Sequence, residues 1–329
     1  MKLPILAVSL LLLVLSSPPA SGEVWTQDGI TISDTEAYTV RAVPSGNGYA
    51  IIIWGTVDGD IFAQKIDNDG NILWAPNGVQ VRADSWGSPH VAPDGLNGAL
   101  CVWAGGSPGT GMASVTAQKI DDSGNLFWAA DGVAVTDSTD LLLGAACVAD
   151  NGAAGAYVTY VWQGDVYAQH LDANGVRQWG NMGLLICDAT VLTQPSAQVA
   201  FRTNIDSDGT GGAIITWSDD RVPPHLGFFM DIYSQRVDPS GPVWTANGVG
   251  VCTDPGGQIL PRQTPDGAGG WVIAWQDGQP ASTDGWKVYA QRIDIDGQLL
   301  WPARGIAVCD TTGPSDPDRY DITPVERAR

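Results

Sequence analysis

The chain has 329 residues, and its 16 Lys and Arg stand against 36 Asp and Glu, which makes a formal charge of -20 at pH 7. So acidic a surface repels a phosphate backbone, and the composition therefore excludes nucleic acid as a partner. Nearly all the acidic residues are Asp rather than Glu. Because Asp favours bends and Glu favours helices, this imbalance predicts a turn-rich β protein.

The N-terminus has the pattern of a secretory signal peptide, which we place at residues 1–22. Lys2 precedes an apolar run from Leu3 to Leu15, and small residues follow as far as Gly22. The run is short for a bilayer span, so cleavage after Ala20 or Gly22 is expected. No Cys lies near that point to carry a lipid anchor. We expect a secreted or periplasmic product with no membrane span after signal cleavage.

One pattern then recurs five times. A Gly opens an apolar run that ends in a first Trp; a variable loop and a strand of the form aliphatic-x-(Ala/Ser)-Gln-x-aliphatic-Asp follow. After an Asp-x-x-Gly turn come a second Trp and, four residues later, a closing Gly. The first Trp is Trp54, Trp103, Trp162, Trp217 and Trp275; the Gln is Gln64, Gln118, Gln169, Gln235 and Gln291; the second Trp is Trp74, Trp128, Trp179, Trp244 and Trp301. One such unit cannot bury its own apolar face, so the units must stack.

The repeat predicts an all-β fold. Its apolar runs are short and bounded by Gly, which is typical of strands, and the period suits four strands a unit. We expect a β-propeller, five-bladed, as one domain over 23–310 with a tail at 311–329. Its repeats are predicted at about 34–84, 85–138, 139–189, 190–254 and 255–310.

The N-terminal strand, 23–33, repeats the closing strand a sixth time. Trp25 and Gly29 are four residues apart, and Ile30-Thr31-Ile32 follows. A strand of this kind can complete a blade begun at the other end of the chain and so close the ring. The alternative is an incomplete six-bladed ring that residues after Asp310 begin.

Two copies of the Gln strand resemble a repeat of known proteins. Residues 232–238 are IYSQRVD and residues 288–294 are VYAQRID. They resemble secreted bacterial proteins with tandem "DIYAQR-h-D, G, W, GV-x-V" repeats, and the resemblance covers nearly the whole mature chain. It implies a β-propeller-like fold and carries over no established activity.

Most of the conspicuous residues have a structural interpretation. Eleven of the 14 Trp stand at the two repeated places, so we expect them in the core. The five Gln are expected to be buried amides that bond backbone. The cysteines are odd in number and three of them occupy equivalent places in different units, so we expect small buried hydrophobes rather than disulfides: Cys101, Cys147, Cys187, Cys252 and Cys309.

The loop between the first Trp and the Gln strand varies in length and is longest in the fourth and fifth copies. Insertions confined to one face of a propeller indicate where a ligand binds, because loops carry binding sites on a rigid scaffold. The alternative is surface loops that drift without function. The candidate binding residues lie in or beside the longer loops: Asp219, Asp220, Arg221, Asp231, Asp277, Asp284 and Trp286.

One segment resembles the first half of a calcium loop. Asn204, Asp206 and Asp208 alternate and Gly209 follows, which is the spacing of oxygen ligands around a turn. The Glu expected six residues after that Gly is replaced by Ile215. The segment therefore predicts either a calcium site or a plain β-turn, and no other cofactor is expected.

These observations predict a secreted binding module that meets an extracellular glycan or protein at the long-loop face. One alternative is a propeller glycosidase that uses paired Asp carboxylates at a defined separation. Another is a passive structural or surface-layer element. A convergent carboxylate pair with one raised pKa would favour the enzyme, whereas an exposed aromatic side chain without such a pair would favour binding. No catalytic residue is assigned from the sequence.

Overall fold

A computed structural model describes residues 29–106, 114–137, 146–188, 203–221, 230–278 and 286–309. The expected signal peptide, most of strand 23–33 and the tail lie outside these residues. Strands and turns account for the described chain, as predicted. In these ranges no helix has the length and hydropathy needed to cross a membrane.

The strands form five antiparallel sheets. Sheet 1 consists of β1 (Ala37–Pro44), β2 (Ala50–Thr56), β3 (Ile61–Ile66) and β4 (Val79–Arg82). Sheet 2 consists of β5 (His90–Pro93), β6 (Ala99–Gly105), β7 (Ser114–Ile120) and β8 (Val133–Ala134). Sheet 3 consists of β9 (Cys147–Asp150), β10 (Ala156–Trp162), β11 (Asp165–Leu171) and β12 (Leu184–Cys187). Sheet 4 consists of β13 (Thr203–Ser207), β14 (Ala213–Asp219), β15 (Asp231–Asp238), β17 (Val249–Cys252) and the short β16 (Gly241–Pro242). Sheet 5 consists of β18 (Gly257–Pro265), β19 (Trp271–Gly278), β20 (Lys287–Ile293) and β21 (Ile306–Cys309).

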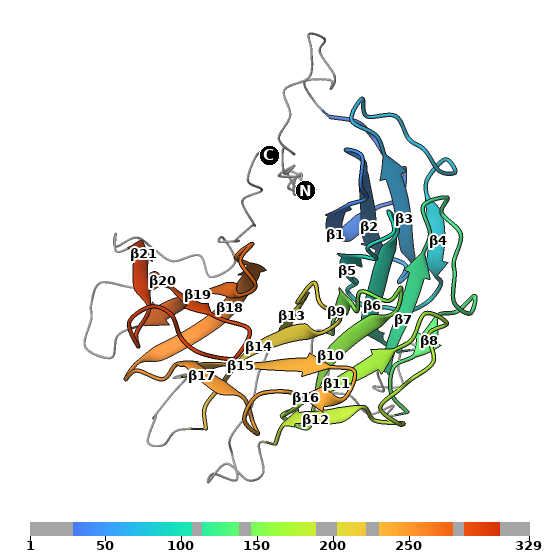
Figure 1. Ribbon diagram of the computed structural model, residues 1–329. Coiled ribbons are helices and arrows are strands. Elements are labelled where there is room, and N and C mark those ends of the chain that lie inside the picture. Colours follow the sequence, from blue (N-terminus) through green and yellow to red (C-terminus); the bar gives the residue numbers. More distant parts are fainter. Residues whose placement is uncertain are drawn as a thin grey trace, which may run out of the picture.

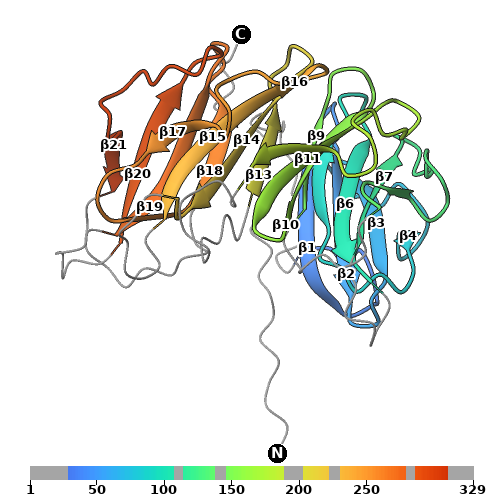
Figure 2. The same cartoon turned by 90° about the horizontal axis from the view of Figure 1, so that it is seen from below.

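The sheets stand side by side around a common centre, with the first strand of each sheet innermost (Figures 1 and 2). Consecutive first strands contact one another from β1 through β5, β9 and β13 to β18. Sheets 1 and 5 are the two ends of an open arc (Figure 1). The predicted closure by the N-terminal strand is not confirmed: sheet 5 has its own fourth strand, β21, and Ile30 and Ile32 pack instead against sheet 1.

The repeated Gln ties the third strand to the segment that follows it. In sheet 1, Gln64 Oε1 accepts the backbone N–H of Trp74 at 3.0 Å, while Gln64 Nε2 donates to the Ala75 carbonyl at 2.8 Å. The same pair of bonds recurs at the other four Gln, and all five are completely buried. A buried amide must satisfy both its ends, which explains why Gln recurs. The predicted role of these residues is confirmed.

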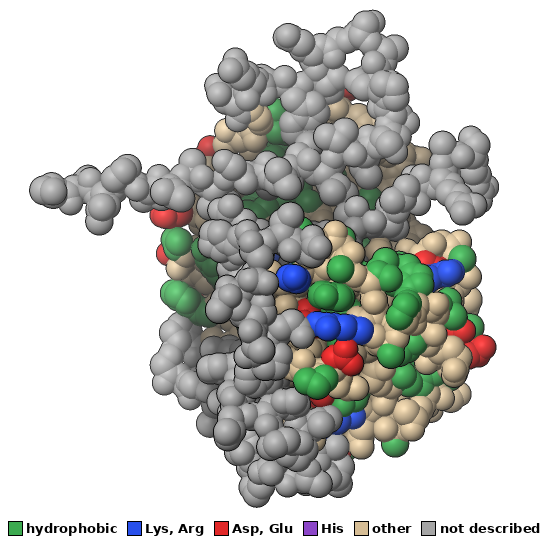
Figure 3. Space-filling model, turned by 90° about the vertical axis from the view of Figure 1, so that its left-hand side faces the viewer, with side chains coloured by type: hydrophobic (Ala, Val, Ile, Leu, Met, Phe, Trp, Pro, Cys, Tyr) green, Lys and Arg blue, Asp and Glu red, His purple; other side chains and the backbone are tan. Residues whose placement is uncertain are grey.

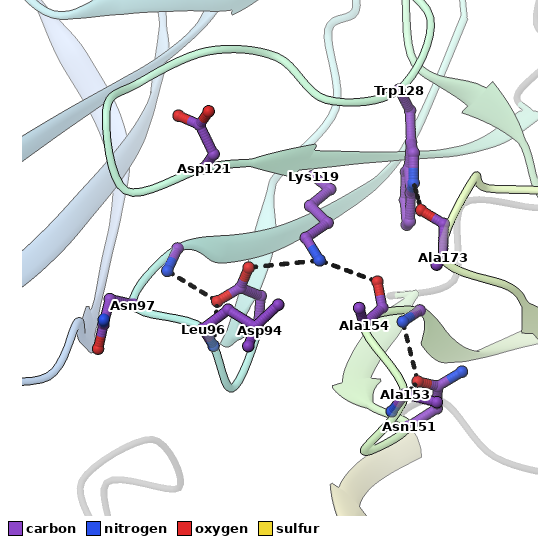
Figure 4. A network of polar contacts seen from close by, with 12 residues as sticks. Asp94, Leu96, Asn97, Lys119, Asp121, Trp128, Asn151, Ala153, Ala154 and Ala173 are labelled. Carbon is purple, nitrogen blue, oxygen red and sulfur yellow. Dashed lines mark hydrogen bonds and ion pairs between the residues drawn. The ribbon is translucent and has the colours of Figure 1, made fainter.

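In the first four repeats, the second Trp joins its sheet to the next one. Trp128 of sheet 2 donates from Nε1 to the carbonyl of Ala173 in sheet 3, at 3.0 Å. Figure 4 shows this bond together with Lys119, whose Nζ lies 3.5 Å from Asp94 and donates to the Ala154 carbonyl of sheet 3 at 2.9 Å. Equivalent Trp bonds connect sheets 1 and 2, 3 and 4, and 4 and 5. The repeated second Trp therefore stabilises sheet-to-sheet contacts.

Close packing explains the repeated glycines. A Cβ atom at Gly155, which precedes β10, would lie 2.2 Å from the carbonyl oxygen of Leu171 at the end of β11. A Cβ atom at the closing Gly248 would lie 2.6 Å from Cη2 of Trp217, the first Trp of the same repeat. No side chain fits in either place, so the first Trp and the closing Gly recur together.

The core expectation for Trp is confirmed in part. The buried ones are Trp54, Trp103, Trp128, Trp217 and Trp275, and Trp271, which lies outside the repeat, is buried too. The half-buried ones lie at seams or sheet ends: Trp74, Trp162, Trp179, Trp244 and Trp301. Four cysteines are buried free thiols, as expected, whereas Cys309 on β21 is exposed.

Candidate functional site

The strand ends that flank the long loops lie on one side of the arc. In sheet 1 the backbone N–H groups of Ser85 and Trp86, on the way to sheet 2, donate to the Gly59 carbonyl in the turn between the second and third strands. The connection between the second and third strands and the connection to the next sheet therefore lie on the same face of the arc. In sheets 4 and 5 the equivalent positions are the C-terminal ends of β14 and β19 and the start of β15, which place Asp219, Asp277 and Asp231 at this face.

Asp219 and Arg221 form a buried ion pair. Arg221 Nε donates to both carboxylate oxygens of Asp219, at 2.9 and 3.0 Å, and Trp217 Nε1 donates to Oδ2 at 2.8 Å. The guanidinium carbon lies 3.4 Å from the centre of the Tyr233 ring. Arg221 also donates to the Asn247 carbonyl at 2.8 Å. Arg221 neutralises the Asp219 carboxylate, and both carboxylate oxygens accept hydrogen bonds. The pair is therefore a rigid support for the residues around it.

Asp231 lies directly across the sheet from Asp219, at the first paired position of β14 and β15. Its side chain is 1% exposed, and neither carboxylate oxygen has a hydrogen-bond partner in the described structure. Burial raises the pKa of Asp231 to about 7; the charges of Asp219 and Asp254 act in the same direction and Arg221 opposes them. A buried carboxyl without a partner is rare in folded proteins, and one with so high a pKa is a candidate functional group.

Asp254 and Arg304 complete the site and were missed in the sequence. Arg304 Nη2 lies 3.3 Å from Oδ1 of Asp277 in the same sheet, and its Nε lies 3.6 Å from Oδ2 of Asp254, in the connection from sheet 4 to sheet 5. Its guanidinium lies over the Tyr289 ring, as that of Arg221 lies over its own tyrosine. The sequence feature that could have revealed Arg304 is a departure from the repeat. Arg304 precedes the closing Gly, where sheets 1 and 4 have Asn.

The acidic strand ends are also a departure from the repeat. Two residues after the first Trp, sheets 4 and 5 have Asp219 and Asp277, whereas the first three sheets have Thr56, Gly105 and Gly164. The stacking of β strands does not require these carboxylates, since three sheets form without them. Their restriction to the two sheets with the longest loops indicates a local role.

The remaining candidates are less closely joined to this site. Asp220 follows Asp219 and is half-buried. Trp286 is half-buried beside Gly278, at the end of β19, so it is less exposed than a free stacking platform would be. Asp284 lies outside the described residues.

The residues of the expected calcium loop have other contacts. Asn204 Nδ2 donates to the Pro261 carbonyl at 2.6 Å. Asp208 accepts the backbone N–H of Thr210 and Gly212 and pairs with Arg236 at 2.6 Å. Within the described ranges, no group of three His, Cys, Asp or Glu side chains is placed to hold a metal ion. Asp206 belongs to the same strand, β13. Calcium binding by these residues stays a prediction, and the Asp208 contacts favour the turn.

The pKa of Asp231 predicts how the Asp231→Asn variant responds to pH. Because the folded pKa, about 7, lies above the ordinary value of 3.8, the folded wild type holds a proton that the unfolded chain loses. Wild-type stability therefore falls as pH rises from about 4 to about 7. The variant lacks this loss, so its stability relative to wild type should increase over that interval and level off above it. Urea unfolding from pH 4 to 9 measures this; a difference that does not vary with pH would refute the assignment.

No protein-family model matches the chain. No curated protein matches it either. Solved structures do: a PL25 ulvan lyase, bound to -[GlcA(1-4)Rha3S]-, has a TM-score of 0.50 at 10% identity, covering 89% of this chain and 78% of that one. Polysaccharide lyase Uly1 has a TM-score of 0.49 at 10% identity, covering 88% and 77%. An endo-arabinase from Bacteroides thetaiotaomicron has a TM-score of 0.42 at 15% identity, covering 82% and 98%. At such identities the likeness is one of fold.

Proposed function

We propose that this protein is a secreted glycan-binding module whose ligand enters the long-loop face at sheets 4 and 5. Asp231 carries the proposal. Its carboxyl group is buried without a partner, next to a charged pair that holds its surroundings rigid. Asp231 is 1% exposed, so the ligand has to displace the groups that cover it. Sugar hydroxyl groups donate and accept hydrogen bonds, and they can then satisfy both oxygens in either protonation state.

The arrangement of neighbouring side chains supports this role. Asp277 and Arg304 add an acceptor and a set of donors at the adjacent seam, and the Arg304 side chain is 38% exposed. Trp286 offers an apolar ring beside the end of β19. A few polar groups among aromatic ones are typical of carbohydrate sites. A fold shared with a polysaccharide lyase is consistent with a glycan ligand.

The second candidate function is hydrolysis by paired carboxylates. It is favoured by the contrast between Asp231, with its raised pKa, and the adjacent Asp219, whose charge is held by Arg221. Two carboxyl groups in such different surroundings can divide the roles of acid and charge stabiliser. However, both Asp219 oxygens already accept bonds from protein donors, which suits a supporting residue better than a nucleophile. Binding is therefore the better-supported function.

A glycan array and a hydrolysis screen on the mature protein test both candidates. We expect at least one glycan to bind without turnover, and Asp231→Asn to weaken that binding at least tenfold while the protein stays folded. Asp137→Asn, at a surface ion pair with Arg177 between sheets 2 and 3, is the matched control and should bind as wild type does. Turnover that Asp231→Asn abolishes would favour the hydrolase. If no glycan binds and none is cleaved, a passive structural role is left.

A further inference from the structure

Each of the first four sheets presents the same contact to the sheet after it. The third residue beyond the closing Gly is an aliphatic side chain that packs into the next sheet's core and is 0–2% exposed: Val81 at 1%, Val135 at 0%, Ile186 at 2% and Val251 at 0%. The second Trp donates to a turn carbonyl of that next sheet, as described above. We call this surface the outer flank of a sheet.

No described residue covers the outer flank of sheet 5 in this way. Val308, which is equivalent to Val251, is 61% exposed, and Ile306 is 43% exposed. Cys309 is exposed, whereas the equivalent Cys187 and Cys252 are buried. Within the described part of the chain, Trp301 makes no bond equivalent to that of Trp244. Figure 3 views the molecule from the side on which sheet 5 lies and shows hydrophobic side chains among polar ones on the described part of that surface.

The other end of the arc carries a segment that is equivalent in sequence to the fourth strand of a sheet. Residues 29–34, the N-terminal segment, lie on sheet 1 as an outer strand lies on the next sheet. Asp34 N–H donates to Asn77 Oδ1 at 3.1 Å, and Asp188, after β12, makes the same bond to Asn247 of sheet 4 at 3.0 Å. Ile30 lies against the turn glycine of sheet 1, as Val133 of sheet 2 lies against that of sheet 3. Residues 30–33 nevertheless pair with no strand among the described residues.

We propose that the gap between the outer flank of sheet 5 and the N-terminal segment receives three antiparallel strands of a partner polypeptide that carries this same repeat. The partner supplies an Asp-x-x-Gly turn whose carbonyl accepts the Trp301 N–H and an apolar second strand that covers Val308. Its Gln strand pairs with the N-terminal segment, which serves as the fourth strand. A second copy of this chain does not fit, because each of its described sheets already has a fourth strand. This inference is independent of the glycan site.

The test inserts a second copy of residues 255–299, the first three strands of sheet 5 with their turn, directly after Asp310 in the full chain. In the parent, iodoacetamide should modify Cys309 rapidly and Cys252 slowly, as read by mass spectrometry. In the extended chain, modification of Cys309 should slow at least tenfold, and hydrogen exchange at residues 30–33 should slow as well. Val308→Asp in the extended chain should restore rapid modification.

Two results would contradict the proposal. The inserted unit is identical to one that folds against the equivalent flank of sheet 4, so an unprotected Cys309 in the extended chain would overturn the proposal. A parent protein that is dimeric by light scattering, with Cys309 already protected, would assign the flank to a second copy and overturn it too.

Discussion

Replacing Arg221 by Met is expected to lower the free energy of unfolding by about 3 to 5 kcal/mol, because a fully buried carboxylate loses its only counter-charge. Arg221 bonds both oxygens of Asp219, whose side chain has no exposed surface. The change also removes the stack on Tyr233 and the bond to the Asn247 carbonyl. Equilibrium unfolding in urea at pH 7, with unchanged slope, measures the loss.

A matched control is Arg177→Met. Its partner Asp137 has a side chain that is 51% exposed, so water replaces the lost bond and the cost should stay below about 1 kcal/mol. The double variant Asp219→Asn with Arg221→Met should recover part of the loss, since no buried charge is then left alone. A loss below 1 kcal/mol for Arg221→Met would show that the ion pair with Asp219 adds little to stability and would remove the rigid support from the proposed site.

Replacing Trp275 by Ala is expected to cost a similar amount, about 3 to 5 kcal/mol, because it opens a large cavity in the last sheet. The ring is completely buried, and it packs on the closing Gly305, where no side chain could fill the space. Differential scanning calorimetry or urea unfolding would measure this loss.

The Phe variants give the sharper comparison. Trp275 Nε1 has no hydrogen-bond partner in the described structure, whereas Trp217 Nε1 donates to Asp219 at 2.8 Å. Trp275→Phe should therefore cost less than Trp217→Phe, although the two residues occupy the same place in the repeat. Equal losses would mean that the indole bond to Asp219 adds nothing to stability.

Repeated residues made much of the fold predictable. The five Gln, the paired Trp and the glycines recur because each satisfies a local requirement, such as a buried amide or a space too small for Cβ. A requirement that recurs in every unit leaves a period in the sequence. The half-buried Trp162 was mispredicted, because the repeat alone does not show how closely the next sheet covers a given ring.

The site was predictable only in outline. Loop length and charge indicated Asp219, Arg221, Asp231 and Asp277. Asp254 and Arg304 lie outside the long loops, and only folding brings them into contact with one another and with Asp277. Apart from the longer loop before it, Asp231 carries no sequence signal that distinguishes it from Asp60 or Asp165, which stand at the same place in the repeat. Its carboxyl group lacks a hydrogen-bond partner because of the residues that folding places around it.

By itself, then, the sequence determined the all-β class, the number of repeats and the residues that join one strand to the next, because those interactions lie within one unit or between adjacent ones. The tertiary structure alone decided that the described sheets form an open arc and that the N-terminal segment lies on sheet 1. It also decided which carboxyl group is left without a partner. These outcomes depend on contacts between residues far apart in the chain, and no local pattern encodes such contacts.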